Sequence, residues 1–580
     1  MRELIDKLRK NNIHISLADG NLKLSFDNEP EMELLDEIKS QKQEIVAYLK
    51  QQELSKGLIN KTERKDILIA PNQLKLWAVD KLLGKSNLYN IPSFYSISGT
   101  LSIANFSKAW SQMLRNHEIL RTVFIERDSG DIYQVVTDHN NPTQIIDARS
   151  WSTSEKNTYI KTICQNFFDL QKGPLCLSVL LQTGPEEFVW VLNFHHIIFD
   201  GWSTGVFLNQ FKTIYQCICE NKSADSFISG SQLQYKDYSA WHNSLIAQNQ
   251  TFKRYWQSVF KIQPERIQLP YKKSHESSTS HQGGSIKLCF DEVWLQQLKR
   301  ICSQEKSTLF SALFALTSAA LSKLSGQTDI IIGTPCSGRD HPQLQELIGF
   351  FVNTVPVRNN LDLRANFREN LNVFSNNINQ AFENQWLPFD QIVDESNISF
   401  DPFRNPLFDV FIAIQNIDYS ANSSVNNTDI FSISPYNLDM DEVAKFDLTF
   451  AYSEFNGELE LYLNYDKNKF GLVYIESIKE VVQTVFNDWV STPNVSLAEV
   501  KALSVAAYNY LNAICSNRKG IELNNYCSVF DKLEEVFISK STEFCLSDDE
   551  YLWSYSDLSQ TINKIAYYLK VNCLLPKGSF

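Results

Sequence analysis

The hydrophobic positions of the first 30 residues change their spacing once. Apolar side chains lie at helical spacing over residues 4–8, and they then alternate with polar side chains over residues 13–17 and 22–26. A period of two predicts two short strands with one buried face, and the Asp19-Gly20 pair between them suits a tight hairpin turn. The pattern therefore predicts a helix followed by a β-hairpin.

A second segment of helical spacing runs from Pro30 to Leu49. Proline suits the first turn of a helix, and the apolar stripe that follows predicts one long helix. Residues 1–55 are thus expected to form a small α-β-β-α unit, which is adequate for binding a partner peptide. The polar residues that follow predict a linker at 56–67. The alternative is that the first 55 residues are an extension of the next domain.

Strand-like apolar runs alternate with amphipathic helices over the next 420 or so residues, which favours an α/β fold of layered sheets and helices. The predicted strands are 94–98, 188–194, 330–333 and 459–465, and the predicted helices are 103–117, 202–217 and 309–324. The polar segment 271–284, rich in Ser and Thr, is the candidate crossing between two lobes at 68–270 and 271–490. Residues 491–580 are expected to hold a linker and the beginning of a further domain, with helices at 529–540 and 558–570.

Composition narrows the function classes. The chain has 580 residues, and 54 Lys and Arg against 67 Asp and Glu give a formal net charge of −13. This balance disfavours nucleic-acid binding, which needs a surplus of basic side chains on one face. The 11 cysteines follow no zinc-binding or redox pattern, so no metal site is expected. We find neither a secretion signal nor an apolar stretch long enough to span a bilayer, which predicts a cytoplasmic protein without membrane contact.

Candidate chemistry concentrates directly after the apolar run 188–194. His195 and His196 follow this run, and Asp200 and Gly201 precede the next predicted helix. Because successive side chains of a strand point to opposite faces, one histidine is expected to face a cleft while the other packs inward. A neutral imidazole suits proton transfer near neutral pH. For a bare histidine pair the structural alternative is two core histidines at a strand end, with Asp200 as a helix cap.

The string HHIIFDG from His195 to Gly201 resembles the HHxxxDG motif of nonribosomal peptide synthetase condensation domains. Further segments resemble that family's motifs and occur in its order, and they begin at Asn72 (NQLKLW), Arg115 (RNHEILRTVF), Tyr235 (YKDYSAW), Gly333 (GTPCSGR), Ile348 (IGFFVNTVPVR), Leu387 (LPFD) and Arg404 (RNPLFDVF). The resemblance implies two chloramphenicol-acetyltransferase-like lobes in a V-shaped pseudo-dimer, with the histidine motif at the floor of a tunnel between them.

The resemblance also implies an acyltransferase that forms an amide bond. The α-amine of an acceptor aminoacyl thioester attacks the thioester carbonyl of a donor, and 4'-phosphopantetheine arms of peptidyl carrier domains hold both substrates. His196 is expected to act as a base or to position the amine, and His195 to orient the turn. Backbone N–H groups near Gly201 are expected to help stabilise the oxyanion.

Two arginines are candidates to support this site. Asp200 is expected to be a structural carboxylate that pairs with Arg339 or, less favourably, with Arg121. The phosphopantetheine belongs to the donor and acceptor carrier domains, so the chain itself is expected to bind no cofactor.

Both ends of the chain carry resemblances of their own. Residues 1–55 resemble the N-terminal docking domains of such synthetases, which capture the C-terminal peptide of an upstream subunit. Residues 552–558 and 566–569 are similar to the first part of an adenylation domain. The nucleotide-binding motifs of that domain are not in this sequence, so adenylation itself is not expected.

Two other functions fit parts of the pattern. The segment GWSTG from Gly201 to Gly205 fits the GxSxG motif of α/β-hydrolases and would make Ser203 a nucleophile. Residues 195–200 separate this segment from the strand that such a nucleophile must follow directly. The second alternative is a non-catalytic gate or scaffold whose lobes only bind carrier domains.

Overall fold

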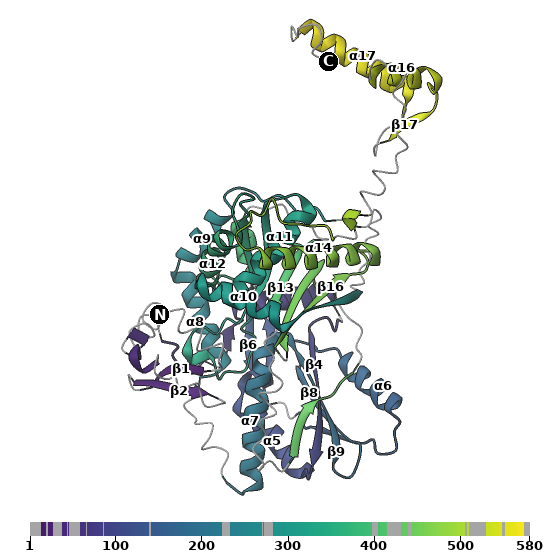
Figure 1. Cartoon of the computed structure of the whole chain (residues 1–580). Helices are drawn as coiled ribbons and strands as arrows, with labels where there is room; N and C mark the ends of the chain where they lie inside the picture. The colour runs from purple at the N-terminus through teal and green to yellow at the C-terminus, as the bar shows by residue number, and fades with distance from the viewer. Residues whose placement is uncertain are drawn as a thin grey trace. The chain divides into compact units, whose positions relative to one another are not determined.

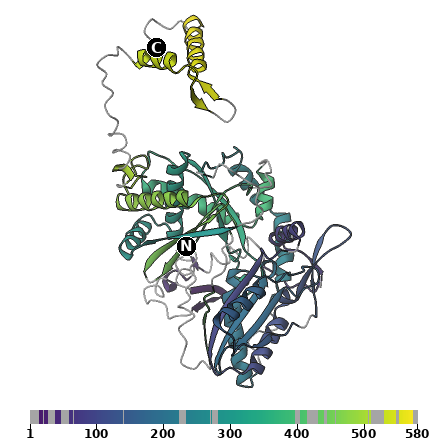
Figure 2. The same cartoon turned by 90° about the vertical axis from the view of Figure 1, so that its right-hand side faces the viewer.

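The computed structural model of the chain consists of two units, Met1–Ala502 and Leu503–Phe580 (Figure 1). The structure describes residues 13–18, 21–26, 38–42, 44–45, 58–64, 66–84, 86–138, 141–222, 233–269, 271, 282–396, 404–414, 431–438, 444–455, 457–504, 507–509, 529–547 and 552–572. Within the first unit, the N-terminal lobe, purple to blue in Figure 2, and the C-terminal lobe, teal to green, each contain a β-sheet of their own.

The N-terminal hairpin forms as the alternating pattern predicts. Strands β1 (Ile13–Ala18) and β2 (Asn21–Phe26) pair antiparallel, and Ala18 lies opposite Asn21. Two residues therefore connect the strands, which confirms the predicted hairpin. The helix expected over residues 4–8 lies outside the described residues. Of the long helix expected after Pro30, residues 38–40, 42 and 44–45 are described as helical.

The N-terminal lobe is built on a five-stranded sheet in the order β14-β4-β9-β8-β7. Its strands are β4 (Asn90–Gly99), β7 (Gln144–Asp147), β8 (Cys176–Gln182), β9 (Glu187–His195) and β14 (Phe431–Pro435). A smaller sheet joins β3 (Asp66–Leu68), β6 (Ile132–Val136) and β5 (Thr122–Glu126), and the helices are α4 (Pro71–Leu83), α5 (Ile103–Asn116), η1 (Glu118–Arg121), α6 (Thr153–Cys164), η2 (His196–Ile198) and α7 (Gly201–Cys219).

Strand β9 is buried on both faces because helices cover both sides of its sheet. Trp190 packs on one side, with its ring centroid 5.0 Å from that of Phe106 in α5 and 4.5 Å from that of Phe211 in α7. Val189 and Val191 point to the other side and join a separate cluster with Ile160 of α6. A strand covered in this way reads as a continuous apolar run, which is how residues 188–194 appear in the sequence.

The C-terminal lobe has a six-stranded sheet in the order β10-β16-β15-β13-β11-β12. Its strands are β10 (Gly283–Phe290), β11 (Asp329–Cys336), β12 (Asn353–Asn360), β13 (Val410–Ile414), β15 (Leu448–Phe455) and β16 (Glu458–Asp466). Its helices are α10 (Glu292–Gln304), α11 (Leu309–Ser325), η4 (Pro342–Leu344), α12 (Phe367–Glu383), α13 (Phe389–Glu395) and α14 (Leu472–Ser491).

Helix α11 forms the centre of this lobe. All of its residues from 311 to 322 are buried, so it is apolar around its whole circumference. The side chain of Thr308 accepts a hydrogen bond from Ser311 N at the start of the helix, and Gly326 ends it in the left-handed conformation with φ 73°. These caps explain why the predicted range 309–324 agrees closely with the observed helix.

Two segments join the lobes. Helix α8 (Tyr235–Gln248), followed by α9 (Thr251–Val259), places Tyr238 against Phe351 of the C-terminal lobe, with ring centroids 4.6 Å apart. Strand β14 comes from the C-terminal half of the chain, yet it pairs with β4 and places Phe431 opposite Gly99. The predicted division at residues 270 and 271 is therefore not strict, because β14 completes the sheet of the N-terminal lobe.

The boundary predicted at residue 490 lies too early. Leu497 is fully buried and Val500 is 3% exposed, and the backbone of Leu497 donates to Ala365 O over 3.0 Å. These contacts attach residues up to Ala502 to the first unit. The second unit contains α16 (Val529–Ser539), the antiparallel pair β17 (Phe544–Ser547) and β18 (Leu552–Ser554), and α17 (Tyr555–Asn572).

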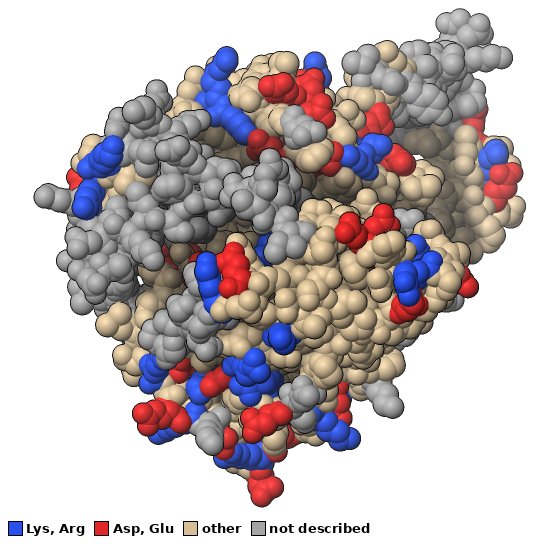
Figure 3. Space-filling view, turned by 90° about the horizontal axis from the view of Figure 1, so that it is seen from below, with Lys and Arg blue, Asp and Glu red and all other residues tan. Residues whose placement is uncertain are grey.

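Across the described ranges, no single helix has the length and apolar character needed to cross a membrane. Helices α10 and α11, which meet at a bend of 108°, pass that test only as a pair, by length and composition. Among the described residues of the face seen in Figure 3, Lys and Arg lie interspersed with Asp and Glu.

Candidate active site

The two histidines lie where a strand passes into a helical turn. His195 is the last residue of β9, and His196 is the first residue of the single turn η2. Helix α7 then begins at Gly201 with Asp200 as its N-cap. His195 is 2% exposed, whereas His196 is partly exposed. The two rings therefore differ in burial as expected, but the end of the strand at His195 contributes to this as well as strand alternation.

The ring of His196 has a defined tautomer. Its Nδ1 lies 2.8 Å from the carbonyl oxygen of Phe199. Because a carbonyl only accepts hydrogen bonds, Nδ1 carries the hydrogen in the neutral ring and Nε2 keeps a free lone pair. Burial and, second, the positive charge of Lys445 lower the pKa of His196 to about 4. His196 is thus a neutral acceptor at neutral pH.

His195 has the opposite arrangement. Its Nδ1 accepts the backbone N–H of Ile197 over 3.1 Å, and its Nε2 lies 4.0 Å from Asp80 Oδ1. Burial and, second, His196 lower the pKa of His195 to about 3. The ring is enclosed and both of its nitrogens face groups of the protein, which suits the expected role in orienting the turn.

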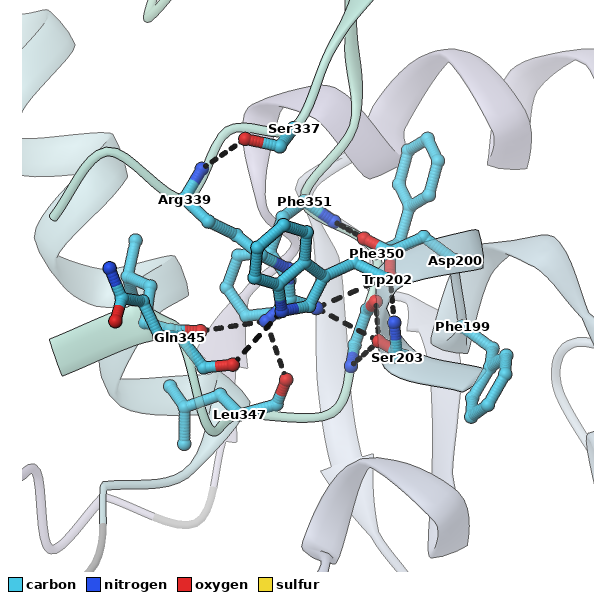
Figure 4. A network of polar contacts seen from close by, with 12 residues as sticks. Phe199, Asp200, Trp202, Ser203, Ser337, Arg339, Gln345, Leu347, Phe350 and Phe351 are labelled. Atoms are coloured by element: carbon cyan, nitrogen blue, oxygen red, sulfur yellow. Dashed lines mark hydrogen bonds and ion pairs between the residues drawn. The ribbon is translucent and has the colours of Figure 1, made fainter. Parts of the chain in front are cut away.

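Asp200 connects the two lobes (Figure 4). Its Oδ1 accepts the backbone N–H of Ser203 over 2.8 Å and lies 3.2 Å from the Arg339 guanidinium, while its Oδ2 accepts the backbone N–H of Phe351 over 3.0 Å. The side chain is fully buried. Asp200 is therefore both the cap of α7 and the ionic partner of Arg339, as the sequence predicts for its pairing.

Arg339 holds a loop of the C-terminal lobe against α7. Its Nη1 donates to the carbonyl oxygens of Leu344 and Leu347, over 2.7 and 2.6 Å, and its Nη2 donates to Ser203 Oγ over 2.9 Å. Its guanidinium lies 4.0 Å from the ring centroid of Phe351. Burial lowers the pKa of Arg339 and Asp200 opposes this change. A guanidinium stays charged in proteins, so Asp200 compensates a buried charge.

Arg121 lies elsewhere, and its expected support of the site is wrong. Its Nε donates to Leu114 O over 2.7 Å and its Nη1 donates to Thr137 O over 2.8 Å. A longer contact of 3.7 Å joins it to the exposed Asp138. Arg121 therefore satisfies carbonyls at the end of α5 and after β6, within the N-terminal lobe.

Ser203 has the wrong environment for a nucleophile. It lies inside α7 with 0% exposure, and its Oγ donates to Gly349 O over 2.9 Å. The same oxygen accepts hydrogen bonds from Gly349 N and from Arg339. A nucleophile elbow needs an exposed serine on the turn after a strand, so the hydrolase interpretation is wrong.

Gly201 lies exposed at the first position of α7. A Cβ atom added there meets no atom within 4 Å. Gly349 is a contrast, because a Cβ on it would lie 2.0 Å from the ring of Tyr235. Gly349 allows tight packing between the lobes, whereas Gly201 leaves open space beside the histidine turn.

Two side chains of α4, to which the sequence assigned no role, also hold the site. Gln73 donates to Ile197 O over 2.6 Å, and Asn72 donates to Phe350 O over 2.6 Å. The ring of Phe350 packs edge-on against His196, with centroids 4.9 Å apart. The motif at residues 72–77 was the available signal, but a local pattern does not reveal contacts with residues far along the chain.

The geometry defines a two-lobed α/β protein with a neutral histidine at the junction of its lobes. A family model described as Condensation domain matches residues 63–511, and the chain belongs to this family. The fold class and the two-lobe architecture expected from the sequence are confirmed. Among the described residues, no group of three or more His, Cys, Asp and Glu side chains is placed to hold a metal ion.

The chain is similar to large bacterial peptide synthases. It is 28% identical to tyrocidine synthase 3 of Brevibacillus parabrevis over 509 residues, which is 87% of this chain and 8% of that protein. It is also 28% identical to bacitracin synthase 1 of Bacillus licheniformis over 521 residues, which is 88% of this chain and 9% of that protein. The chain thus spans less than a tenth of the length of these two relatives.

Solved structures show the same fold. The X-domain from teicoplanin biosynthesis matches 77% of this chain and 100% of its own, with a TM-score of 0.69 and 19% identity. A four-domain nonribosomal peptide synthetase matches 88% of this chain and 39% of its own, with a TM-score of 0.67 and 19% identity.

Proposed function

We propose that the chain forms amide bonds in nonribosomal peptide biosynthesis. The substrates are a donor acyl or peptidyl thioester and an acceptor aminoacyl thioester, each on the 4'-phosphopantetheine arm of a carrier domain. The observation that carries this proposal is the neutral His196 with its free Nε2 lone pair, in a chain of the condensation domain family. The acceptor α-amine is the group that this lone pair suits.

The pKa of His196 limits what the ring does. An α-ammonium group has a pKa of about 7.7–8.0, so an imidazole with a pKa of about 4 does not deprotonate it to a useful extent. His196 Nε2 instead accepts a hydrogen bond from the amine that is already neutral, and this contact directs the nitrogen lone pair at the donor carbonyl. Positioning of two tethered reactants supplies a large share of the rate.

The bonds formed and broken during amide formation balance in this arrangement. The amine nitrogen attacks the donor carbonyl carbon and gives a tetrahedral intermediate with a positive nitrogen and an oxyanion. That nitrogen is now acidic, and it passes one proton to His196 Nε2. The intermediate expels the donor pantetheine thiolate, which takes up that proton. The peptide, one residue longer, remains on the acceptor carrier.

The head of α7 is our candidate for the oxyanion. The first N–H groups of a helix have no partner within the helix and carry partial positive charge. Gly201 is exposed at this position and has open space around it, so a carbonyl group approaches without a side chain in its path. Donors placed in advance at a developing charge are typical of acyl-transfer enzymes.

Further parts of the proposal concern partners and location. Carrier domains are the donor and acceptor partners, and residues 1–55 bind the C-terminal docking peptide of an upstream subunit. The hairpin β1–β2 supports this because a short sheet edge suits an added peptide. The second unit corresponds to the first part of an adenylation domain. Arg339 supports the site through its ion pair with Asp200. The chain holds no cofactor of its own, and the protein acts in the cytoplasm.

Reconstitution tests the function. The full chain is mixed with a donor carrier and an acceptor carrier, loaded separately with synthetic aminoacyl-pantetheine, and the acceptor carrier is analysed by intact-protein mass spectrometry. Amide formation predicts a dipeptidyl acceptor carrier that appears only when the chain is present. A chain that binds both carriers and yields no dipeptide is instead a non-catalytic scaffold.

A further inference from the structure

Helix α4 contacts the histidine turn at two places, and the second contact has no part in the mechanism above. Gln73 lies in its first turn and Asp80 in its last. Seven residues separate them, which is close to two helical turns, so both side chains lie on the same face. We propose that Asp80 is a positioning residue for the condensation reaction: it fixes the Nε2–H tautomer of His195, which in turn holds the turn that carries His196. The inference rests on the proposed function of that turn.

The tautomer of His195 follows from its contacts. The backbone N–H of Ile197 points at Nδ1 over 3.1 Å, so Nδ1 must be unprotonated to accept it. In the neutral ring the hydrogen is then on Nε2, which faces Asp80 Oδ1 at 4.0 Å. This separation exceeds a direct hydrogen bond, and the attraction between the N–H dipole and the carboxylate is what favours this tautomer.

The other tautomer would break the turn. A hydrogen on Nδ1 would face the hydrogen of the Ile197 amide, and that amide would lose its acceptor in a buried place. The carbonyl of Ile197 is held from the other side by Gln73. The backbone N–H and the backbone carbonyl of Ile197 are therefore each held by a side chain. His195 accepts from the N–H, and Gln73 donates to the carbonyl.

Aromatic rings enclose the imidazole ring of His195. Its ring centroid lies 6.3 Å from that of Phe168, edge-on, and 6.5 Å from that of Tyr89. The backbone oxygen of Tyr89 accepts the N–H of His196 over 2.8 Å, which fixes the other side of the turn. With the ring enclosed, the position of its hydrogen is the property that Asp80 controls.

Asp80 is itself in an unusual place for a carboxylate. Its side chain is 19% exposed. Burial, and then the nearby Asp169, raise the pKa of Asp80, while Lys81 opposes this change. A helix ending at the surface does not need an acidic residue in its last turn, where the helix dipole disfavours negative charge. The contact with His195 supplies a reason for a carboxylate at this position.

Two substitutions separate the size of the side chain from its charge. Asp80→Asn keeps the size and removes the charge that faces Nε2–H, whereas Asp80→Ala removes both. In the reconstituted assay with the full chain, we expect Asp80→Ala to lower kcat about tenfold, because the tautomer that holds the turn loses the carboxylate that favours it, with KM for the acceptor carrier nearly unchanged. Asp80→Asn should lower kcat by a similar factor, because the amide lacks the negative charge that favours the Nε2–H tautomer. Lys81→Gln, which removes the neighbouring charge on the same helix, is the control with unchanged kcat.

A spectroscopic measurement reports the tautomer directly. In protein labelled with ¹⁵N at histidine, two-bond correlations distinguish protonated from unprotonated ring nitrogens, and the spectrum of His195→Asn assigns the His195 signals. We expect unprotonated Nδ1 and protonated Nε2 in the native chain and a mixed pattern in Asp80→Ala. His195→Asn should also keep more activity than His195→Ala, because an asparagine oxygen accepts the Ile197 N–H.

The outcomes decide between the possibilities. Wild-type kcat together with an unchanged His195 pattern in Asp80→Ala overturns the inference. If Asp80→Ala does not fold, Asp80→Asn decides, since wild-type kcat in the folded Asp80→Asn variant contradicts the role of the carboxylate charge. If the native chain forms no amide at all, the proposed function fails, but the nitrogen spectra of the native and Asp80→Ala chains still test the tautomer.

Discussion

Asp200 of the N-terminal lobe and Arg339 of the C-terminal lobe form an ion pair in which both side chains are at most 1% exposed. The carboxylate also caps α7 and holds the backbone of Phe351, so one side chain connects the histidine turn with the opposite lobe. The lobes are thus joined by a buried polar network directly beside the candidate site (Figure 4).

Replacing Asp200 by Ala should destabilise the first unit before it causes a specific kinetic defect. Removing one partner leaves the Arg339 charge buried and uncompensated, which costs about 3–5 kcal/mol. Urea unfolding followed by circular dichroism measures this loss. Asp147→Ala, which breaks the exposed pair with Arg149, is the matched control and should change stability little. A stable, well-folded and inactive Asp200→Ala variant would show that the structural assignment of Asp200 is wrong.

Stability should fall as the pH drops from about 6.5 to 4. Burial lowers the pKa of His117, His196 and His242 to about 4 and that of His195 to about 3. The unfolded chain takes up protons below about 6.5 while these rings stay neutral in the fold. Each histidine therefore contributes a slope of about 1.4 kcal/mol per pH unit across this window, and its stabilising effect is complete above it.

His242 allows this effect to be isolated. Its Nε2 donates to Trp386 O over 2.8 Å and its Nδ1 lies 3.1 Å from the hydroxyl of Tyr238, so the neutral ring is held from both sides. Urea-unfolding curves at several pH values should show a shallower decline for His242→Gln than for the native chain, by one proton. Equal slopes in the two proteins would contradict the lowered pKa of His242.

The pH dependence of activity should reflect the acceptor amine and not an ordinary histidine. Because His196 is neutral above about pH 4, its ionisation does not limit the rate between pH 5 and 8. The rate of amide formation should instead rise up to about pH 8 as the α-amine loses its proton. Single-turnover measurements across this range test the prediction. An acidic limb near pH 6.5 that His196 variants abolish would contradict this account, because it would assign His196 a higher pKa and the deprotonation of the free α-ammonium group.

Gly201→Ala should preserve the fold and impair the reaction. The added methyl group meets no protein atom within 4 Å, and alanine in place of glycine in a helix stabilises by about 0.4–1 kcal/mol. The methyl group would enter the space that we assign to the donor carbonyl, so a rate loss of tenfold or more is expected, on the order of one lost oxyanion contact. Gly205→Ala, one turn later in α7 and equally open, is the control. Equal rates in the two variants would remove Gly201 from the site.

Local patterns predict the elements of the fold well. The hairpin at residues 13–26, the buried strand β9 and the core helix α11 are all evident from apolar spacing, turn residues and caps. The pairing of β14 with β4 is not evident from the sequence. It joins segments more than 300 residues apart and depends on the packing of the whole unit. The sequence predicts the end of the C-terminal lobe at residue 490, whereas the first unit extends to Ala502. The prediction is too early because a short buried segment after a long helix resembles a linker in the sequence.

The candidate site shows the same division. The motif containing His195, His196, Asp200 and Gly201 is recognisable as a string, and the pairing of Asp200 with Arg339 is expected. The prediction for Arg121 is wrong because sequence does not show which acceptor a buried arginine reaches. Gln73 and Asp80 lie against Ile197 and His195, and Asn72 donates to Phe350 of the other lobe, all across more than 100 residues. Such contacts exist only once the chain has folded, so a local pattern does not predict them.

The most direct test of the account is the product formed by His196→Ala. The full-length variant is incubated with separately loaded donor and acceptor carriers, and the dipeptidyl acceptor carrier is quantified by mass spectrometry beside the native chain, with melting curves to confirm the fold. The account predicts an intact fold and a loss of product of about 10²-fold or more. Undiminished dipeptidyl carrier from a folded His196→Ala variant would contradict the assignment of His196 as the group that positions the amine.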